Sequence, residues 1–435
     1  MPVGGRKVPP VSVEKEHATV ASTISGREVD LAGMWNRMFE SRVITDYGPE
    51  GFAAIAALPG GESLEWCYGC GKCVPACPVD MVGDYGPRKI HRRVQTGTAL
   101  MDDADLWLCT TCGNCLRVCP KEVDMLAIMP AVREGALSSS KVPTELQDVF
   151  EKTFRYGNAL GQNPRRRGQW TENAGAKVRV LSKEPGPVDV LFYVEDYWSF
   201  HPRGQDAAKC FARVAEALGI DWAILGPEEK TVGDSQRLAG EKGLFESLVD
   251  DVTAVLGRYD FNRIVTPDPH AFNAFVTEYR QRGHEYEVMH YTQLLAPLVD
   301  QIPWARELDM TVTFHDPCYL GRRNGEYDAP RALLEAIPGV RLVEMGRCRE
   351  NAYCCGGGGG GMWLDGFTRD HMSERLSERR VREAAQTGAE VLAVCCPYEV
   401  PRFSDAAKST GHEELRVCDV IELVDEAMRE GSGRG

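Results

Sequence analysis

The pattern of apolar and polar residues changes near the middle of the chain. The first part has short segments with helical spacing, at residues 31–39, 52–58, 88–100 and 102–108. From residue 188 onward, short apolar runs typical of buried strands alternate with amphipathic helices. The expected strands are 188–194, 222–225, 263–266, 310–314, 341–344 and 390–394, and the expected helices are 205–218 and 330–337. The chain therefore predicts a helical domain followed by an α/β region.

The α/β region contains an internal repeat at an offset of about 122 residues. Val190-Leu191-Phe192 aligns with Val312-Thr313-Phe314, and Tyr197 aligns with Tyr319. In this register Asp196 stands where the second copy has Cys318. Two similar halves are expected, of which only the second has metal ligands.

Clusters of Ser, Pro and Gly between residues 137 and 187 are linker signals. The expected organisation is an N-terminal extension (1–60), a cysteine-rich domain (61–136), a helical or linker segment (137–187) and two α/β halves (188–307 and 308–435).

Two cysteine runs fit the pattern C-x2-C-x2-C-x3-C-P. The first run is Cys67, Cys70, Cys73 and Cys77, and the second run is Cys109, Cys112, Cys115 and Cys119. Three thiolates at this spacing wrap around one [4Fe–4S] cluster, and the fourth, followed by proline, turns towards the other cluster. The expected ligand sets are Cys67, Cys70, Cys73 with Cys119, and Cys109, Cys112, Cys115 with Cys77. Structural zinc is the alternative, although zinc sites usually combine two separated C-x2-C pairs.

A second cysteine constellation follows in the last part of the chain: Cys318, Cys354-Cys355-Gly356 and Cys395-Cys396-Pro397. Adjacent cysteines share a disulfide poorly, but both can bind iron. The glycines from Gly356 to Gly361 remove the side chains beside the pair, so the backbone can approach a cluster and space remains for a substrate. A phosphate-binding loop is the weaker alternative, because no Lys-Ser/Thr follows.

These residues resemble a known family. Cys318, Cys354-Cys355-Gly356 and Cys396-Pro397-Tyr398 resemble the cysteine-rich CCG domain of heterodisulfide reductases. The fusion of this domain to a two-cluster segment is similar to the D subunit of heterodisulfide reductases and to the K subunit of the sulfite-reductase-associated membrane complex. The resemblance covers residues 62–419, including the stretches 268–272, 315–322 and 354–363.

The resemblance implies an α-helical bis-[4Fe–4S] ferredoxin domain fused to a pseudo-twofold α/β pair of CCG type. It also implies a third [4Fe–4S] centre, cubane or noncubane, that reduces or reversibly forms a disulfide with electrons from the two ferredoxin clusters. The expected catalytic residues are Cys318, Cys354, Cys355, Cys396 and His315. The family's last C-x-x-C motif reads Cys396-Pro397-Tyr398-Glu399 here, so a fifth ligand would be Cys395 or Glu399.

The expected partners are a disulfide substrate, on a small molecule or a carrier protein, and a redox subunit, either a flavoprotein or a cytochrome b-like membrane protein. The alternative function is electron transfer between a flavoprotein dehydrogenase and a quinone or membrane cytochrome partner. A net charge of −14 argues against nucleic acid. No apolar stretch is long enough to span a membrane, so a cytoplasmic protein is expected, held peripherally at the membrane by a partner.

Other residues have ordinary structural interpretations. Cys210, Cys348 and Cys418 are expected to be small core residues, and the stretch 165–167 of three arginines a solvated linker. His315 and Asp316 could supply a proton or make structural hydrogen bonds. Arg322, Arg323 and Asn324 could line an anionic site or cap a turn. His270 and His290 are expected to bind backbone groups.

Overall fold

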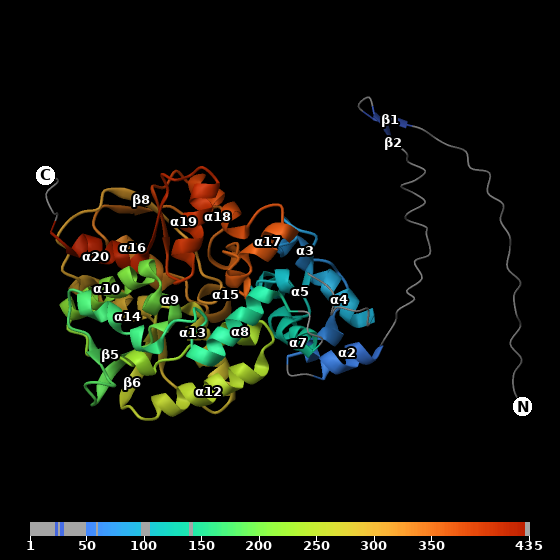
Figure 1. Cartoon of the computed structure of the whole chain (residues 1–435). Coiled ribbons are helices and arrows are strands. Elements are labelled where there is room, and N and C mark those ends of the chain that lie inside the picture. Colours follow the sequence, from blue (N-terminus) through green and yellow to red (C-terminus); the bar gives the residue numbers. More distant parts are fainter. Residues whose placement is uncertain are drawn as a thin grey trace, which may run out of the picture. The chain divides into compact units, whose positions relative to one another are not determined.

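The structure is a computed structural model of the chain, and it describes residues 22–24, 27–29, 49–57, 60–96, 105–138 and 142–430. It contains two compact units, Met1–Tyr47 and Gly48–Gly435 (Figure 1). In the first unit, β1 (Ser22–Ile24) pairs antiparallel with β2 (Arg27–Val29). The helix expected at residues 31–39 lies outside the described residues. Because residues 48–435 form one compact unit, the domain boundaries within it remain predictions.

Short helices surround both cysteine runs. α3 (Cys73–Ala76) ends just before Cys77, whose backbone is extended, as a residue before proline requires. α6 (Asn114–Arg117) begins after Gly113, which has a φ of 83°. The other helices of this part are α2 (Pro49–Ala56), α4 (Pro87–Thr96), α5 (Asp105–Leu108), α7 (Met125–Ser138) and α8 (Thr144–Tyr156).

Two parallel sheets form the α/β region. The first has the order β3-β5-β4-β6-β7 and the second the order β11-β10-β8-β9. The first sheet consists of β3 (Arg179–Val180), β4 (Val188–Phe192), β5 (Trp222–Ile224), β6 (Phe261–Thr266) and β7 (Val288–His290). The second consists of β8 (Met310–Phe314), β9 (Val340–Leu342), β10 (Val391–Val394) and β11 (Arg416–Asp419).

The two sheets share a strand order. The series β5-β4-β6-β7 corresponds to β9-β8-β10-β11, and β4 and β8 begin at residues 188 and 310, the offset found in the sequence. The loop after β5 and the loop after β9 each contain a glycine in the left-handed region, Gly233 at φ 82° and Gly356 at φ 87°. The same backbone geometry therefore recurs where the first half lacks cysteines and the second half has them.

Helices cover both sheets, as buried parallel strands require. In the first half they are α9 (Glu195–Phe200), α10 (Pro202–Ala217), α11 (Asp234–Leu238), α12 (Lys242–Leu256), α13 (Pro269–Asn273) and α14 (Tyr291–Leu295). In the second half they are α15 (Gly321–Asn324), α16 (Asp328–Ala336), α17 (Asp365–His371), α18 (Leu376–Ala385), α19 (Glu399–Ser409) and α20 (Val420–Met428).

The hydrophobic core connects these parts. One apolar cluster joins the two halves, with Phe192 and Phe314 among its fully buried side chains. Another joins the cysteine-rich helices to the second sheet and contains both Cys112 and Cys354. In Figure 1 the cysteine-rich helices, in blue and cyan, accordingly lie against the orange segment around α17. The cysteine-rich part thus packs on the second half through a shared core.

The expected strands and helices of the α/β region are present, with shifted ends. The strand expected at residues 341–344, for example, is Val340–Leu342. The interpretation of residues 165–167 as a solvated linker is wrong for Arg167, which is 2% exposed, whereas Arg165 and Arg166 are exposed. Arg167 is buried because two carboxylates from the first half hold it.

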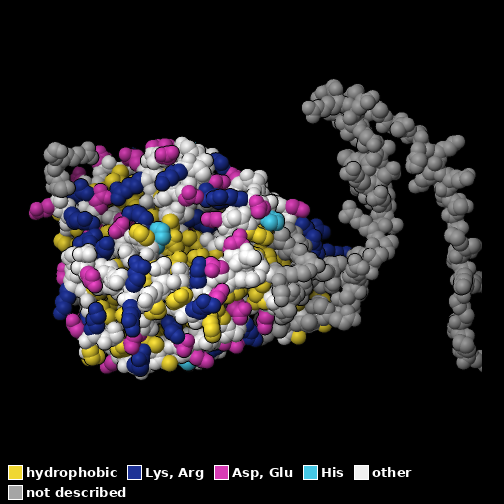
Figure 2. Space-filling model, in the orientation of Figure 1, with side chains coloured by type: hydrophobic (Ala, Val, Ile, Leu, Met, Phe, Trp, Pro, Cys, Tyr) yellow, Lys and Arg dark blue, Asp and Glu magenta, His cyan; other side chains and the backbone are white. Residues whose placement is uncertain are grey.

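The surface of the larger unit mixes both signs of charge. On the face drawn in Figure 2, acidic and basic side chains are interspersed over the α/β region. Among the described residues, no helix has the length and apolar character needed to cross a membrane.

Candidate iron–sulfur centres

The cysteines of the two runs line two neighbouring cavities. Cys67, Cys70, Cys73 and Cys119 line a cavity of about 440 Å³. Cys77, Cys109, Cys112 and Cys115 line one of about 330 Å³. Cys115 also faces the first cavity. Each group contains the four thiols of one expected ligand set, and the assignment of ligands remains a prediction.

The first cavity is the more accessible of the two. Cys70 is the one exposed cysteine among the sixteen of the chain. A hydrogen bond from the backbone N–H of Lys72 is the main cause that lowers the pKa of Cys70. In the second cavity, burial raises the pKa of Cys77 to about 12 and that of Cys115 well above its usual value. Buried thiols of this kind lose their protons when a metal ion compensates the charge.

Four further cysteines converge at the carboxyl ends of the second sheet, and we call them the third site. Cys318 follows β8, Cys354 and Cys355 precede the glycine run, and Cys396 follows β10. All four are at most 8% exposed. Hydrogen bonds from the Cys112, Cys318 and Cys355 thiols, in this order of importance, lower the pKa of Cys354 well below its usual value.

A cavity of about 280 Å³ lies at the third site. Cys318, Cys355 and Cys396 line it, together with Glu399, which replaces the last cysteine of the family's motif. Around these are His270, Tyr319, Tyr398, Pro269, Pro317 and Gly357. Cysteines from three separate stretches thus share one space, whereas Cys354 does not line it.

The donor set fits iron–sulfur clusters. Backbone N–H groups donate to sulfur in both the second run and the third site, an arrangement that stabilises thiolates bound to iron. These bonds join Thr111 N to Cys109 Sγ (3.4 Å), Val123 N to Cys119 Sγ (3.4 Å), Gly356 N to Cys354 Sγ (3.3 Å) and Gly357 N to Cys355 Sγ (3.4 Å).

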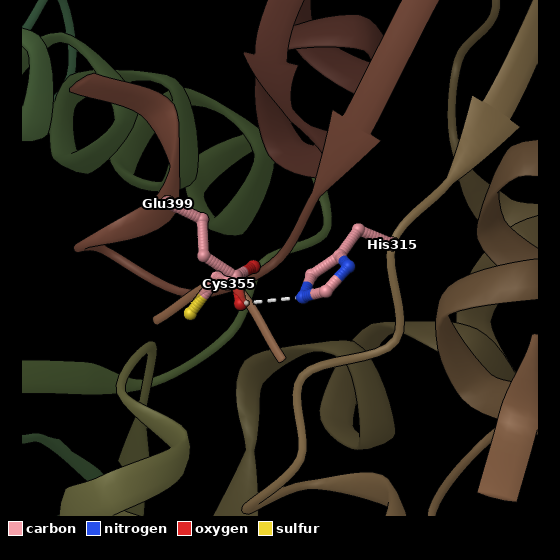
Figure 3. A group of neighbouring side chains, drawn as sticks. All are labelled: His315, Cys355 and Glu399. Carbon is pink, nitrogen blue, oxygen red and sulfur yellow. Dashed lines mark ion pairs between the residues drawn. The ribbon is translucent and has the colours of Figure 1, made fainter. Parts of the chain in front are cut away.

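Glu399 and His315 lie beside Cys355 (Figure 3). One ligand atom of each lies within 4.8 Å of the others, and His315 Nε2 is 3.1 Å from Glu399 Oε1. Burial is the main cause that raises the pKa of Glu399 well above its usual value. Burial also lowers the pKa of His315, with Arg380 as the second cause. His315 is therefore neutral, with Arg380 Nε donating to its Nδ1 at 3.0 Å.

Two histidines differ from their expected places. His315 does not line the cavity at the third site, whereas His270 does. His270 stacks on Tyr319 with ring centroids 4.0 Å apart, and its Nδ1 lies 2.7 Å from Asp234. Sequence reasoning missed this role because His270 belongs to the first half. The signal that could have found it is its position two residues after Asp268, because Asp268 follows the end of β6 by two residues as Cys396 follows the end of β10.

Cys395 and Cys396 face different environments. Cys395 is fully buried in the apolar cluster between the two sheets, whereas Cys396 lines the cavity. Of the two candidates for a fifth ligand, Glu399 therefore adjoins the third site and Cys395 does not. Cys210 and Cys418 occupy the same apolar cluster, as expected. The interpretation of Cys348 as a core residue is wrong, because Cys348 is half-buried and belongs to none of the apolar clusters.

The glycine run packs directly on the second cysteine run. A Cβ at Gly358 would lie 2.4 Å from the carbonyl oxygen of Thr110, and one at Gly359 would lie 2.3 Å from that of Cys109. The expectation of substrate space is therefore wrong at Gly358 and Gly359, where the backbone of the second run fills it, whereas Gly357 lines the cavity at the third site. The close packing brings the Cys354 and Cys112 thiols near one another, within the same apolar cluster.

The first half has an ionic cluster at the equivalent place. Asp196, which stands where the repeat has Cys318, pairs with Arg167 at 2.5 Å. Arg167 also pairs with Glu229 at 2.9 Å, and all three side chains are buried. Carboxylates and an arginine thus replace a set of thiolates in this half.

Comparisons with known proteins agree with this arrangement. The family of the 4Fe-4S dicluster domain matches residues 63–123, and that of the cysteine-rich domain CCG matches residues 312–398. "Probable iron-sulfur-binding oxidoreductase FadF" of Bacillus subtilis is 36% identical, over 79% of this chain and 48% of that protein. "EtfAB:quinone oxidoreductase" of Syntrophomonas wolfei is 31% identical, over 74% of this chain and 46% of that protein. The chain spans about half the length of these two relatives.

A third relative matches over nearly its whole length. The D subunit of the dihydromethanophenazine:CoB--CoM heterodisulfide reductase of Methanosarcina barkeri is 30% identical over 408 residues, which are 84% of this chain and 94% of that protein. With both cysteine domains in the same chain, this match shows that the protein belongs to the family of the heterodisulfide reductase D subunit, among iron–sulfur oxidoreductases.

Proposed function

We propose that the chain is an electron-transfer subunit in which three iron–sulfur sites form one series from the surface to the third site. The observation that carries the proposal is the close packing of the second run on the third site: Cys112 and Cys354 lie in one apolar cluster, and the glycine run after Cys355 packs against the backbone of Cys109 and Thr110. Cys115, which faces both ferredoxin-type cavities, connects the first two sites. When bound, the clusters supply one-electron transfer.

The proposed ligands follow the three groups of thiols. Cys67, Cys70, Cys73 and Cys119 would hold one [4Fe–4S] cluster, and Cys77, Cys109, Cys112 and Cys115 the other. Cys318, Cys354, Cys355 and Cys396 would hold a third cluster, for which four thiolates suffice as a cubane. Glu399 is the proposed fifth donor for a noncubane form, because its carboxylate adjoins Cys355.

A redox partner would dock over the first run. Exposed Cys70 lies between Tyr68, which is 64% exposed, and Lys72, and Arg88 lines the same cavity. An exposed aromatic and basic rim around a redox site suits transient docking. The alternative stated from the sequence, a link between a flavoprotein and a quinone-side partner, agrees with the name of the EtfAB:quinone oxidoreductase relative.

The enclosure of the third site supports electron transfer to a partner over turnover of a substrate there. Its cavity, about 280 Å³, is smaller than the cavities of about 440 and 330 Å³ at the other two sites. The glycine run leaves no further room on the side of Thr110.

Disulfide reduction is the second candidate, and a different observation favours it. His270 lines the cavity beside Cys355 and Cys396, and hydrogen bonding to Asp234 raises its pKa against the opposing effect of burial. A protonated imidazole at this place could supply one of the two protons that accompany the two electrons when a disulfide becomes two thiols. The match with the heterodisulfide reductase relative over 94% of its length supports the same candidate.

Iron analysis and spectroscopy of the anaerobically purified protein test the proposal. Three cubane clusters require about 12 iron atoms per chain, and two require about 8. Cys355→Ser should remove the signals of the third site only, with Cys348→Ser, outside all three groups, as the matched control. About 8 iron atoms in the wild-type protein would contradict the third site.

The two candidates differ in how the reduced protein is reoxidised. Electron transfer predicts reoxidation by a quinone analogue or an oxidised flavoprotein, and no change in the electron paramagnetic resonance of the oxidised protein on adding thiol. A thiol-dependent paramagnetic state that Cys355→Ser abolishes would instead establish disulfide chemistry at the third site.

A further inference from the structure

Most buried arginines of this protein have carboxylate partners. Arg167 pairs with Asp196 and Glu229, and Arg331 pairs with Asp316 and Glu344. A buried cation without an anion costs several kcal/mol, so such pairing is expected.

Arg322, which is half-buried, departs from this rule. No described carboxylate forms an ion pair with it, and its Nη2 is buried without a hydrogen-bond partner among the described residues. The groups whose negative charge favours the guanidinium are Cys112, Cys318, Cys354 and Tyr327, in this order. The negative charge that compensates Arg322 therefore comes from the thiols Cys112, Cys318 and Cys354.

The contacts of Arg322 bridge the second run and the third site. Its Nε donates to the carbonyl oxygen of Cys112 at 2.9 Å. Its Nη1 donates to the carbonyl oxygen of Ala352 at 2.6 Å, two residues before Cys354. Arg322 itself belongs to α15, which begins three residues after Cys318. One side chain thus touches the two segments whose thiols would bind two different clusters.

Arg133 provides a natural comparison. It is fully buried and donates to the carbonyl oxygens of Leu106, Cys109, Leu238 and Gly359. Cys109, Tyr85 and Tyr319, and no carboxylate, are the charges that favour its guanidinium. Arg133 therefore adjoins the second run but not the thiols of the third site.

We propose that Arg322 is the counter-charge shared by two cluster sites, and that it raises the reduction potentials of both. One is the second-run site, the site of Cys77, Cys109, Cys112 and Cys115, and the other is the third site. The inference rests on the proposed function, because it presupposes clusters at these thiols. A thiolate-bound cluster is anionic and becomes more negative on reduction, so a buried cation beside it stabilises the reduced form. A cation between two such sites lowers the cost of placing an electron on either one.

The test is a redox titration of the full-length protein, purified anaerobically and followed by electron paramagnetic resonance. In Arg322→Gln, the equilibrium constant for reduction should fall at least tenfold, a shift of about −59 mV, at both the second-run site and the third site. The first-run site should keep its potential. Arg322→Lys should keep both potentials near those of the wild type.

Two further variants separate charge from position. Arg133→Gln should lower the potential of the second-run site and leave the third site unchanged. Arg323→Gln, in the same turn as Arg322, is the control for the loss of a cation from α15 and should shift neither. Unchanged potentials in Arg322→Gln with full iron content, or a shift at one of the two sites alone, would overturn the proposal.

Loss of iron in a variant is also decisive. If Arg322→Gln and Arg322→Met both lose iron while Arg322→Lys keeps it, the positive charge is required for assembly, as the proposal expects. If all three variants lose iron alike, the geometry of the bridge matters and its charge does not, which would overturn the proposal. A wild-type protein with about 8 iron atoms would contradict the third site itself, and the second-run potential would then still report the effect of Arg322.

Discussion

Replacing Gly358 by alanine tests the packing of the glycine run on the second cysteine run. The new Cβ would lie 2.4 Å from the carbonyl oxygen of Thr110, whereas ordinary contacts begin at 3.4 Å. One of the two backbones must therefore move by about 1 Å, the difference between these distances. Gly358 does not occupy the left-handed region, so the cost is steric. Overpacking of this kind costs about 1–3 kcal/mol.

Urea unfolding under anaerobic conditions, followed by the absorbance of the clusters, measures this cost. Gly358→Ala should lower the midpoint and leave the slope of the free energy against urea unchanged. The displacement also separates Cys354 from Cys112, because their contact depends on the same packed loops. Electron transfer from the ferredoxin-type clusters to the third site, measured by rapid mixing, should therefore slow in this variant.

Two other glycines calibrate the result. A Cβ at Gly346 would meet no atom within 4 Å, so Gly346→Ala should change the stability by no more than about 0.5 kcal/mol. Gly359→Ala should cost more than Gly358→Ala. Its Cβ would lie 2.3 Å from the carbonyl oxygen of Cys109, and its φ of 62° adds about 1–2 kcal/mol of backbone strain. If Gly358→Ala were as stable as Gly346→Ala, the proposed role of the glycine run would be refuted.

Three further predictions concern other parts of the molecule. Arg167→Ala should lower the free energy of unfolding by about 3–5 kcal/mol, because it leaves two buried carboxylates unpaired, and should leave the iron content unchanged. Burial lowers the pKa of His290 from 6.5 to about 4. Between pH 6.5 and pH 4, the imidazole of His290 therefore binds a proton in the unfolded chain but not in the folded protein. Stability should therefore fall by about 2–3 kcal/mol as the pH drops from 6.5 to 4, and a urea series in His290→Gln should lack this part of the slope. Cys396→Ala should lower the iron content by about 4 atoms per chain, whereas Cys395→Ala should keep all the iron; equal losses would contradict the different placement of these two thiols.

Local patterns were sufficient for much of the architecture. The C-x2-C-x2-C-x3-C-P spacing depends on residues within one or two turns of chain, and Pro78 imposes the extended backbone that ends α3. The strands of the second half were recognisable for the same reason: β8 is the apolar run Met310–Phe314, as expected. The repeat offset likewise indicated two similar halves before any contact was known, and their sheets share a strand order.

Longer-range features escaped a reading of the sequence. Arg167 looked solvated because its two neighbours are arginines, yet Asp196 and Glu229, far along the chain, bury it. The sequence alone does not distinguish the environment of Cys395 from that of Cys396. Successive residues at the end of β10 point to opposite faces of the sheet. One therefore enters the apolar core and the other the cavity.

The sequence by itself determined the two C-x2-C-x2-C-x3-C-P runs and marked the later cysteines as candidate ligands, because cysteine spacing and proline placement act over a few residues. Only the tertiary structure decided how the groups meet. Cys112 contacts Cys354, and Gly358 contacts Thr110, across more than two hundred residues of chain. Such contacts depend on how whole helices and sheets pack in the shared core, and no local pattern specifies that packing. The proposed series of iron–sulfur sites is therefore a property of the folded molecule.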